Sequence, residues 1–66
     1  MPKTLEELAT MIANRDGITF EEAWASVRDC AAEMESAFMD GSLDEAEEIL
    51  KETLQLEPDY LDLFIF

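Results

Sequence analysis

The chain has 66 residues, of which 17 are acidic, four are basic and none is histidine, so its formal net charge at pH 7 is −13. A hydrophobic content of 48%, with only two Gly and two Pro, excludes a disordered acidic tail and predicts one folded domain over residues 1–66. The charge argues against direct binding to nucleic acid or to an anionic membrane, and no apolar run is long enough to span a bilayer.

The first residues and the single cysteine indicate a cytoplasmic protein. Met1-Pro2-Lys3 leads directly into Leu-Glu-Glu, so we expect no signal peptide. Cys30 leaves no internal disulfide, which fits a reducing compartment. Because Cys30 shares an apolar helix face with Val27 and Met34, we expect an inert buried thiol, with a redox or disulfide-linked dimer role as the alternative.

Helix start and stop signals divide the chain into four segments. Three tetrapeptides, 4–7, 19–22 and 42–45, place Ser or Thr at an N-cap and Glu three residues later, which is the capping-box pattern. Gly17 and Gly41 can adopt the left-handed conformation that ends a helix. These signals predict helices over 5–15, 20–39 and 43–56, and Pro58 predicts a short fourth helix to about residue 64.

Apolar residues in these segments recur at spacings of three and four, and no segment alternates with period two. The predicted core stripes are Leu5, Leu8, Ala9 and Ile12; then Phe20, Ala23, Trp24, Val27, Cys30, Ala31, Met34 and Phe38; then Leu43, Ala46, Ile49, Leu50, Thr53 and Leu54. Two short glycine-containing connections imply antiparallel neighbours. The predicted fold is therefore all-α: a small three-helix bundle with helix 20–39 at its centre and a short fourth carboxy-terminal helix.

The sequence offers little material for catalysis. Without histidine, and with one cysteine on an apolar face, it shows no nucleophile and base, so we expect no enzyme and no cofactor. Neither glycine fits position 6 of a calcium-binding EF-hand loop, because Gly17 would place Ile12 at position 1 and Gly41 would place Phe38 at position 3. We expect no specific metal site.

The acidic residues are distributed unevenly. Residues 1–32 contain six acids and three bases, whereas residues 33–66 contain eleven acids and one base, Lys51, expected to offset Glu47 and Glu48. The outer face of helix 43–56 is predicted to carry Asp44, Glu45, Glu47, Glu48 and Glu52. This face is either a solvated surface or a surface that docks on a protein partner with a basic patch, including a mimic of nucleic-acid phosphates.

The last seven residues are unusually apolar for so charged a chain. The candidate partner-binding residues are Tyr60, Leu61, Leu63, Phe64 and Phe66. The segment either folds back over the open end of the core or forms an exposed patch that pairs with another protein or, through residues 64–66, with a second copy. Residues 61–64, Leu-Asp-Leu-Phe, also resemble the motif Gln-Leu-Ser/Asp-Leu-Phe that binds the bacterial sliding clamp, although Tyr60 stands in place of Gln.

Two wider resemblances concern fold and origin. Lys3-Thr4, Ile12-Ala13, Gly17-Ile18-Thr19 and Ala23 are similar in spacing to the opening helical hairpin of bacterial HU-type histone-like proteins. This resemblance implies the hairpin geometry but not DNA binding, since the basic arm and strands of that family have no counterpart here. Size, charge and the ending Leu56-Glu-Pro-Asp-Tyr-Leu61 resemble short acidic helical proteins of bacterial phages and mobile elements.

Together these features predict a non-enzymatic acidic protein-interaction module that regulates or inhibits a basic, nucleic-acid-handling partner. One alternative is a self-associating structural protein that dimerises through its apolar carboxy-terminal residues. The other is a sliding-clamp-binding protein that uses residues 61–64.

Overall fold

The computed structural model describes residues 2–65 and confirms the all-α class. Three α-helices, α1 (Leu5–Asp16), α2 (Phe20–Met39) and α3 (Leu43–Leu54), are followed by the 3-10 helix η1 (Pro58–Phe64). No strand occurs in this part of the chain. None of its helices has the length and apolar character needed to cross a membrane.

The three predicted capping boxes form to different extents. The box at the start of α2 is complete, because Thr19 Oγ1 accepts from the Glu22 amide at 3.1 Å and Glu22 Oε1 accepts from the Thr19 amide at 3.2 Å. At the start of α1, Thr4 Oγ1 accepts from the Glu7 amide, but the Glu7 carboxylate accepts from the Lys3 amide instead. The third prediction is wrong, since Ser42 makes no side-chain capping bond.

Both glycine signals mark helix ends correctly, whereas the third helix ends earlier than predicted. Gly17 and Gly41 have φ angles of 68° and 75°, in the left-handed region predicted for them. The predicted end of the third helix at residue 56 is too late, because Gln55 is left-handed with φ 55° and ends α3 at Leu54. The turn at Gln55 places Leu56 in the core rather than on the helix.

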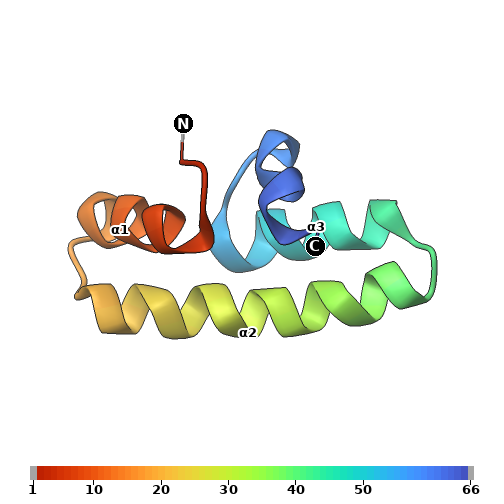
Figure 1. The fold of residues 1–66 in the computed structure, drawn as a ribbon, viewed down its shortest axis with the longest axis horizontal. Coiled ribbons are helices and arrows are strands. Elements are labelled where there is room, and N and C mark those ends of the chain that lie inside the picture. The colour runs from red at the N-terminus through yellow and green to blue at the C-terminus, as the bar shows by residue number, and fades with distance from the viewer. Residues whose placement is uncertain (1, 66) are drawn as a thin grey trace.

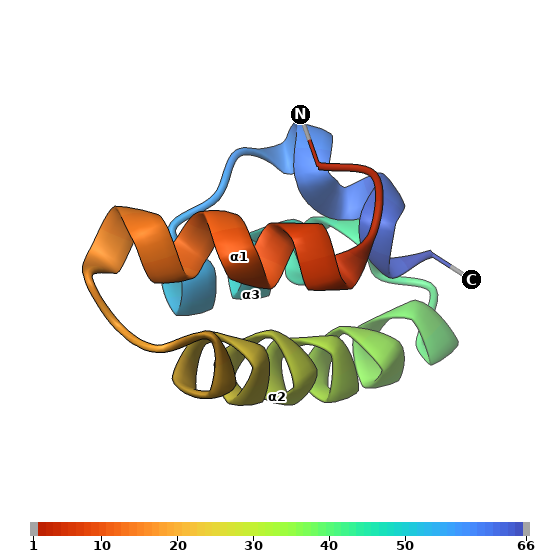
Figure 2. The same cartoon turned by 60° about the vertical axis from the view of Figure 1, so that its left-hand side comes forward.

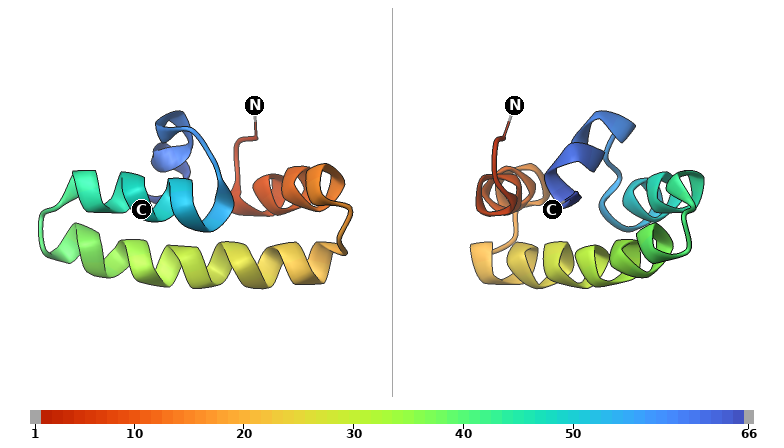
Figure 3. Two further views of the ribbon diagram at one scale, coloured as in Figure 1. Left: turned by 180° about the vertical axis from the view of Figure 1, so that it is seen from behind. Right: turned by 45° about the vertical axis from the view of Figure 1, so that its right-hand side comes forward.

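The helices are arranged along α2, as Figure 1 shows. The views in Figures 1 and 3 place α1 along the first half of α2 and α3 along its second half, both antiparallel to it. Figure 2 shows α1 and α3 on the same side of α2, with η1 above them. The main interfaces are those of α2 with α1 and with α3, followed by that of α3 with η1, so a closed three-helix bundle is not confirmed.

The core between these elements is entirely apolar in the described part of the chain, with no buried polar or charged side chain. Buried residues at helical spacing include Leu8 and Ile12 of α1, Val27 and Met34 of α2, and Leu50 of α3. Residues from all three helices meet η1 residues in one cluster. The core thus joins both halves of the molecule along a single side of α2.

Three residues of the predicted core stripes are exposed instead. Phe20 is 44% exposed and Leu43 is 55% exposed, and Thr53 is also exposed. Phe20 and Leu43 are the first residues of their helices, where the neighbouring helix no longer covers the apolar face. Trp24 is half-buried and stacks on Phe20, with ring centroids 6.1 Å apart.

Candidate functional site

The outer face of α3 carries most of the acidic residues predicted to bind a partner. Ala46, Leu50 and Leu54 turn inward and are buried. At 3.6 residues per turn, the opposite side of the helix then holds Asp44, Glu45, Glu48 and Glu52, all exposed. Glu47 is only half-buried at the margin of this face, beside Pro58 and the start of η1. The structure thus places four of the five residues on the exposed face and Glu47 at its margin, where it lines a recess together with Asp44, Glu48 and Lys51.

No ion pair forms on this face in the described part of the chain, although Lys51 lines the same recess as Asp44, Glu47 and Glu48. Among residues 2–65 the ion pair that forms joins Arg15 and Asp16, with 2.8 Å between Arg15 Nε and Asp16 Oδ1, and this contact lowers the pKa of Asp16. The expected pairing of Lys51 with Glu47 or Glu48 is therefore not formed. Since Asp44, Glu48 and Glu52 follow one another at i, i+4, their like charges repel across one helix face.

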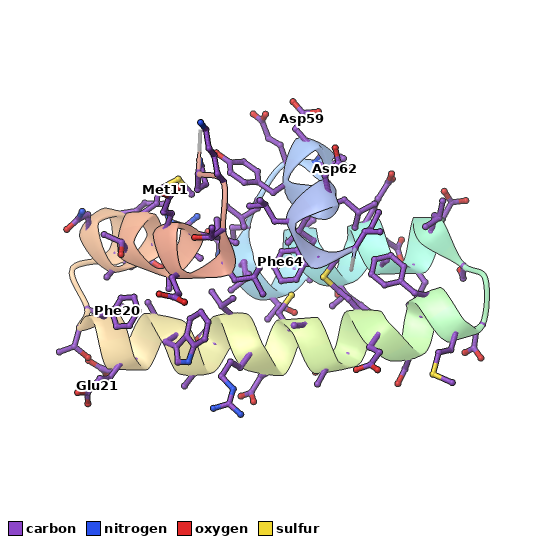
Figure 4. The ribbon with its side chains drawn as sticks, viewed as in Figure 1. Met11, Phe20, Glu21, Asp59, Asp62 and Phe64 are labelled. Carbon is purple, nitrogen blue, oxygen red and sulfur yellow. The ribbon has the colours of Figure 1, made fainter. Side chains whose placement is uncertain are left out.

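The predicted carboxy-terminal residues lie mostly in or against the core. Phe64 is 2% exposed and Leu61 is buried, whereas Tyr60 and Leu63 are half-buried. In Figure 4 the ring of Phe64 points from η1 toward α2, whereas Asp59 and Asp62 point away from it. Phe66 lies outside the described residues. The segment therefore folds back on the helices, as one of the two alternatives for it predicted.

The 3-10 helix also connects the two halves of the molecule. Tyr60 Oη lies 3.8 Å from Met11 Sδ on α1, a contact across 49 residues of sequence. Its main packing partner is nevertheless α3. Because Leu61 and Phe64 are core residues, a partner that bound residues 61–64 in extended form would have to displace η1 from the helices.

An apolar groove lies where α2, α3 and the end of η1 meet, and sequence reasoning did not identify it. Its lining residues are Glu35, Phe38, Met39, Leu43, Phe64 and Ile65. Met39 is 82% exposed, Leu43 55% and Ile65 53%. The signal available was the short Asp40-Gly41-Ser42 turn, which sets the apolar residues Met39 and Leu43 at its two edges. We refer to these six lining residues as the turn groove.

Cys30 has the environment expected of an inert thiol. Its side chain is fully buried on α2, and Sγ lies 3.5 Å from Met34 Sδ. Burial in this apolar environment, with a smaller contribution from Glu33, raises its pKa to about 11. The thiolate that nucleophilic or redox chemistry requires is therefore disfavoured at neutral pH.

No cluster of three or more potential metal ligands is found in the part of the chain from residue 2 to residue 65. Glu47, Asp59 and Asp62 do line one shallow recess beside η1, together with Pro58 and Leu61. The carboxylates of Asp59 and Asp62 point outward in Figure 4. This recess therefore adds to the negative surface around α3.

Comparisons with known proteins found no relative, so a function for this chain is inferred from its residues and their geometry. The chain matches no model of a known protein family, no curated protein and no solved structure.

Proposed function

We propose that the protein is a non-enzymatic acidic interaction module whose carboxy-terminal half docks on a basic surface of a nucleic-acid-handling protein and regulates or inhibits it. One observation carries the proposal. Residues 33–50, the start of the more acidic half, contain seven acidic residues and no basic one, and six of the seven are exposed while Glu47 is half-buried.

Electrostatics supports this proposal over a purely solvated face. Like-charge neighbours on α3 cost stability, and a chain this short has only a few kcal/mol of net stability, on the order of 3–5 kcal/mol. Solubility alone requires less charge than −13 on so small a domain. A basic partner removes the repulsion on binding, and the field of the acidic half accelerates its association.

The test is capture of host proteins on the immobilised chain at low and high salt. We expect the captured proteins to be basic, to be released as salt rises, and to lose nucleic acid when the chain is added. The triple variant Glu45→Gln, Glu48→Gln and Glu52→Gln should lose the partner. A matched variant of the other half, Glu6→Gln, Glu21→Gln and Asp29→Asn, should keep it. Capture that is unchanged between low and high salt would rule out mimicry of nucleic-acid phosphates.

Self-association is the second candidate, favoured by the exposure of Met39, Leu43 and Ile65. It requires two surfaces of the same charge to approach, which is unfavourable at low salt. Sedimentation at high protein concentration tests it, and a monomer would eliminate it. Clamp binding through residues 61–64 stays a prediction, and no capture of the intact chain by a sliding clamp would end it.

The remaining expectations concern setting and fold detail. A cytoplasmic location, an origin in a phage or mobile element, and a hairpin like that of HU-type proteins stay predictions of the sequence. So does a closed three-helix bundle. The proposed interaction depends only on the exposed face of α3 and on residues near it, and does not require any of these.

A further inference from the structure

We infer that the turn groove holds an apolar anchor on a basic amphipathic helix of the partner, with the flanking lysines and arginines of that helix lying on the surrounding acids. This inference rests on the proposed function and specifies how the partner binds. It assigns the groove, rather than the α3 face alone, as the centre of the interface.

The groove has a packed floor and an open rim. The rings of Phe64 and Phe38 form the floor. Phe64 is 2% exposed and belongs to the buried core cluster, and Phe38 is half-buried and packs against that cluster. Met39, Leu43 and Ile65 form the rim, and each is more than half exposed. An apolar side chain placed between them would remove water from three large apolar residues at once, and the flexible Met39 adapts to different anchors.

The construction of the turn explains why no residue of the turn itself covers this rim. At the α1–α2 turn, the amide of Ile18 donates to Ala13 O at 3.1 Å, and the Ile18 side chain packs against the core. At the α2–α3 turn the equivalent bond runs from the Ser42 amide to Ala37 O at 3.0 Å. Because Ser42 occupies the place of Ile18, the second turn lacks the apolar side chain that normally covers the end of a helix.

Phe20, the other exposed large apolar side chain of α2, has a partner of its own. Phe20 stacks on Trp24 with an angle of 11° between the rings. It also lies at the opposite end of α2 from the turn groove, as the labelled Phe20 in Figure 4 shows. Phe20 therefore provides a matched control site for substitutions in the groove.

Charge selects the kind of occupant. Glu35 lines the groove itself, Asp40 begins the turn beside Met39, and Asp44 follows Leu43. The nearest basic residue after the turn is Lys51, eight residues and about 12 Å along α3 from Leu43. A second copy of the chain or an acidic segment would add like charge here, whereas a segment with Lys and Arg around its anchor is attracted.

The experiment uses three synthetic helical peptides of about 16 residues, a length at which helices become marginally stable. The first has Leu and Phe on one face and Lys on the other. The second keeps the Lys residues and replaces Leu and Phe by Ala, and the third keeps Leu and Phe and replaces Lys by Glu. Binding to the full chain is measured by calorimetry and mapped by amide chemical shifts, at low and high salt.

We expect the first peptide to bind most tightly, with shifts at Met39, Leu43 and Ile65. The double variant Met39→Ser and Leu43→Ser should weaken it at least about tenfold, since removing even one large apolar side chain from the interface has an effect of that order. Phe20→Ser should leave its affinity unchanged. If the double variant is less stable, Ile65→Ser gives an independent single test. Trp24 fluorescence reports whether the groove variants are folded, because Trp24 lies about 22 Å along α2 from Met39 and is not itself part of the groove.

The outcomes separate the two proposals. If the first and second peptides bind equally, charge alone is recognised, so the groove inference is wrong and the proposed function stands. If the third peptide binds as well as the first, the occupant is not basic and the inference is overturned. If neither lysine peptide binds at low salt, the proposed function itself fails. A dimer that dissociates in the Met39→Ser variant would identify a second copy as the occupant and overturn the inference.

Discussion

The two turns that join α2 to its neighbours share a local sequence pattern and close differently. Each places Asp and Gly before a Ser or Thr, and each Gly is left-handed. In the first turn Ile18 separates Gly17 from Thr19, so one residue completes the end of α1 and another caps α2. In the second turn Ser42 follows Gly41 directly, so the same residue completes the end of α2 and occupies the N-cap of α3.

This difference of one residue has a structural consequence. The amide of Ser42 is committed to Ala37 O, and its ψ angle is 87° instead of the 158° of Thr19. The Ser42 amide is therefore not available to the Glu45 carboxylate, its hydroxyl makes no capping bond, and the turn itself provides no apolar side chain to cover the end of α2. A turn that is one residue shorter thus leaves the start of α3 without a side-chain cap and the junction of the two helices open, and this junction lies in the more acidic half.

The largest expected loss of stability distinguishes Phe64, which is buried against the helices, from its exposed neighbour Ile65. Phe64→Ala should cost about 3–5 kcal/mol of unfolding free energy, because it empties a fully buried aromatic site. That is comparable with the entire stability of so short a domain, so we expect loss of the cooperative transition. Ile65→Ala, one residue later and 53% exposed, should change the unfolding free energy by less than about 0.5 kcal/mol.

Urea unfolding followed by circular dichroism measures both variants. Phe64→Leu serves as a milder replacement, which should remain folded with reduced stability. Equal stability of the Phe64→Ala and Ile65→Ala variants would contradict the docking of η1 on the helices.

The next effect concerns the two caps of α2 and α3. Thr19→Ala should cost about 1 kcal/mol, because it removes the acceptor for the Glu22 amide and breaks a complete capping box. Ser42→Ala should cost no more than a few tenths of a kcal/mol, roughly the propensity difference alone. The midpoints of urea unfolding measure the difference, and a larger loss at Ser42 than at Thr19 would show that the two turns do not differ in this way.

Much of this architecture is predictable from local signals. The 3.6-residue spacing, the two left-handed glycines and the cap at Thr19 locate both ends of α2 correctly and those of α1 to within one residue. The sequence-based predictions fail where one residue takes part in two helix ends, or where tertiary contacts determine the backbone conformation. Ser42 carries a capping pattern but its amide is already used, and Gln55 adopts a left-handed angle so that Leu56 can enter the core.

One part of the candidate site is likewise predictable from the sequence and another part is not. Helical spacing alone identifies the exposed acids of α3, because the inward residues Ala46, Leu50 and Leu54 define the opposite face. The turn groove cannot be predicted from spacing, since its rim residues come from α2, from α3 and from the residue after η1, and they resemble core residues. Only the packing of η1 brings Ile65 beside the other two. The apolar carboxy-terminal residues likewise allowed two interpretations, and the burial of Leu61 and Phe64 shows that these two residues belong to the core.

The smallest expected effect tests whether the acidity of α3 has an energetic cost. Glu48 has Asp44 and Glu52 at i±4, so Glu48→Gln removes two repulsive contacts and should raise the melting temperature by about 2 °C at low salt. Glu21 has no acid at i±4 and lies in the first turn of α2, where negative charge favours the helix dipole. Glu21→Gln should therefore lower the melting temperature slightly.

Salt completes this test, since screening weakens both interactions between exposed charges. The opposite shifts of the Glu48→Gln and Glu21→Gln variants should converge toward zero at high salt, while the parent chain itself melts at a higher temperature. Thermal melts at two salt concentrations measure all three. A parent melting temperature that does not respond to salt would mean that the α3 acids do not repel one another. In that case relief of repulsion could not contribute to binding a basic partner, and only the attraction between the two surfaces would remain to drive it.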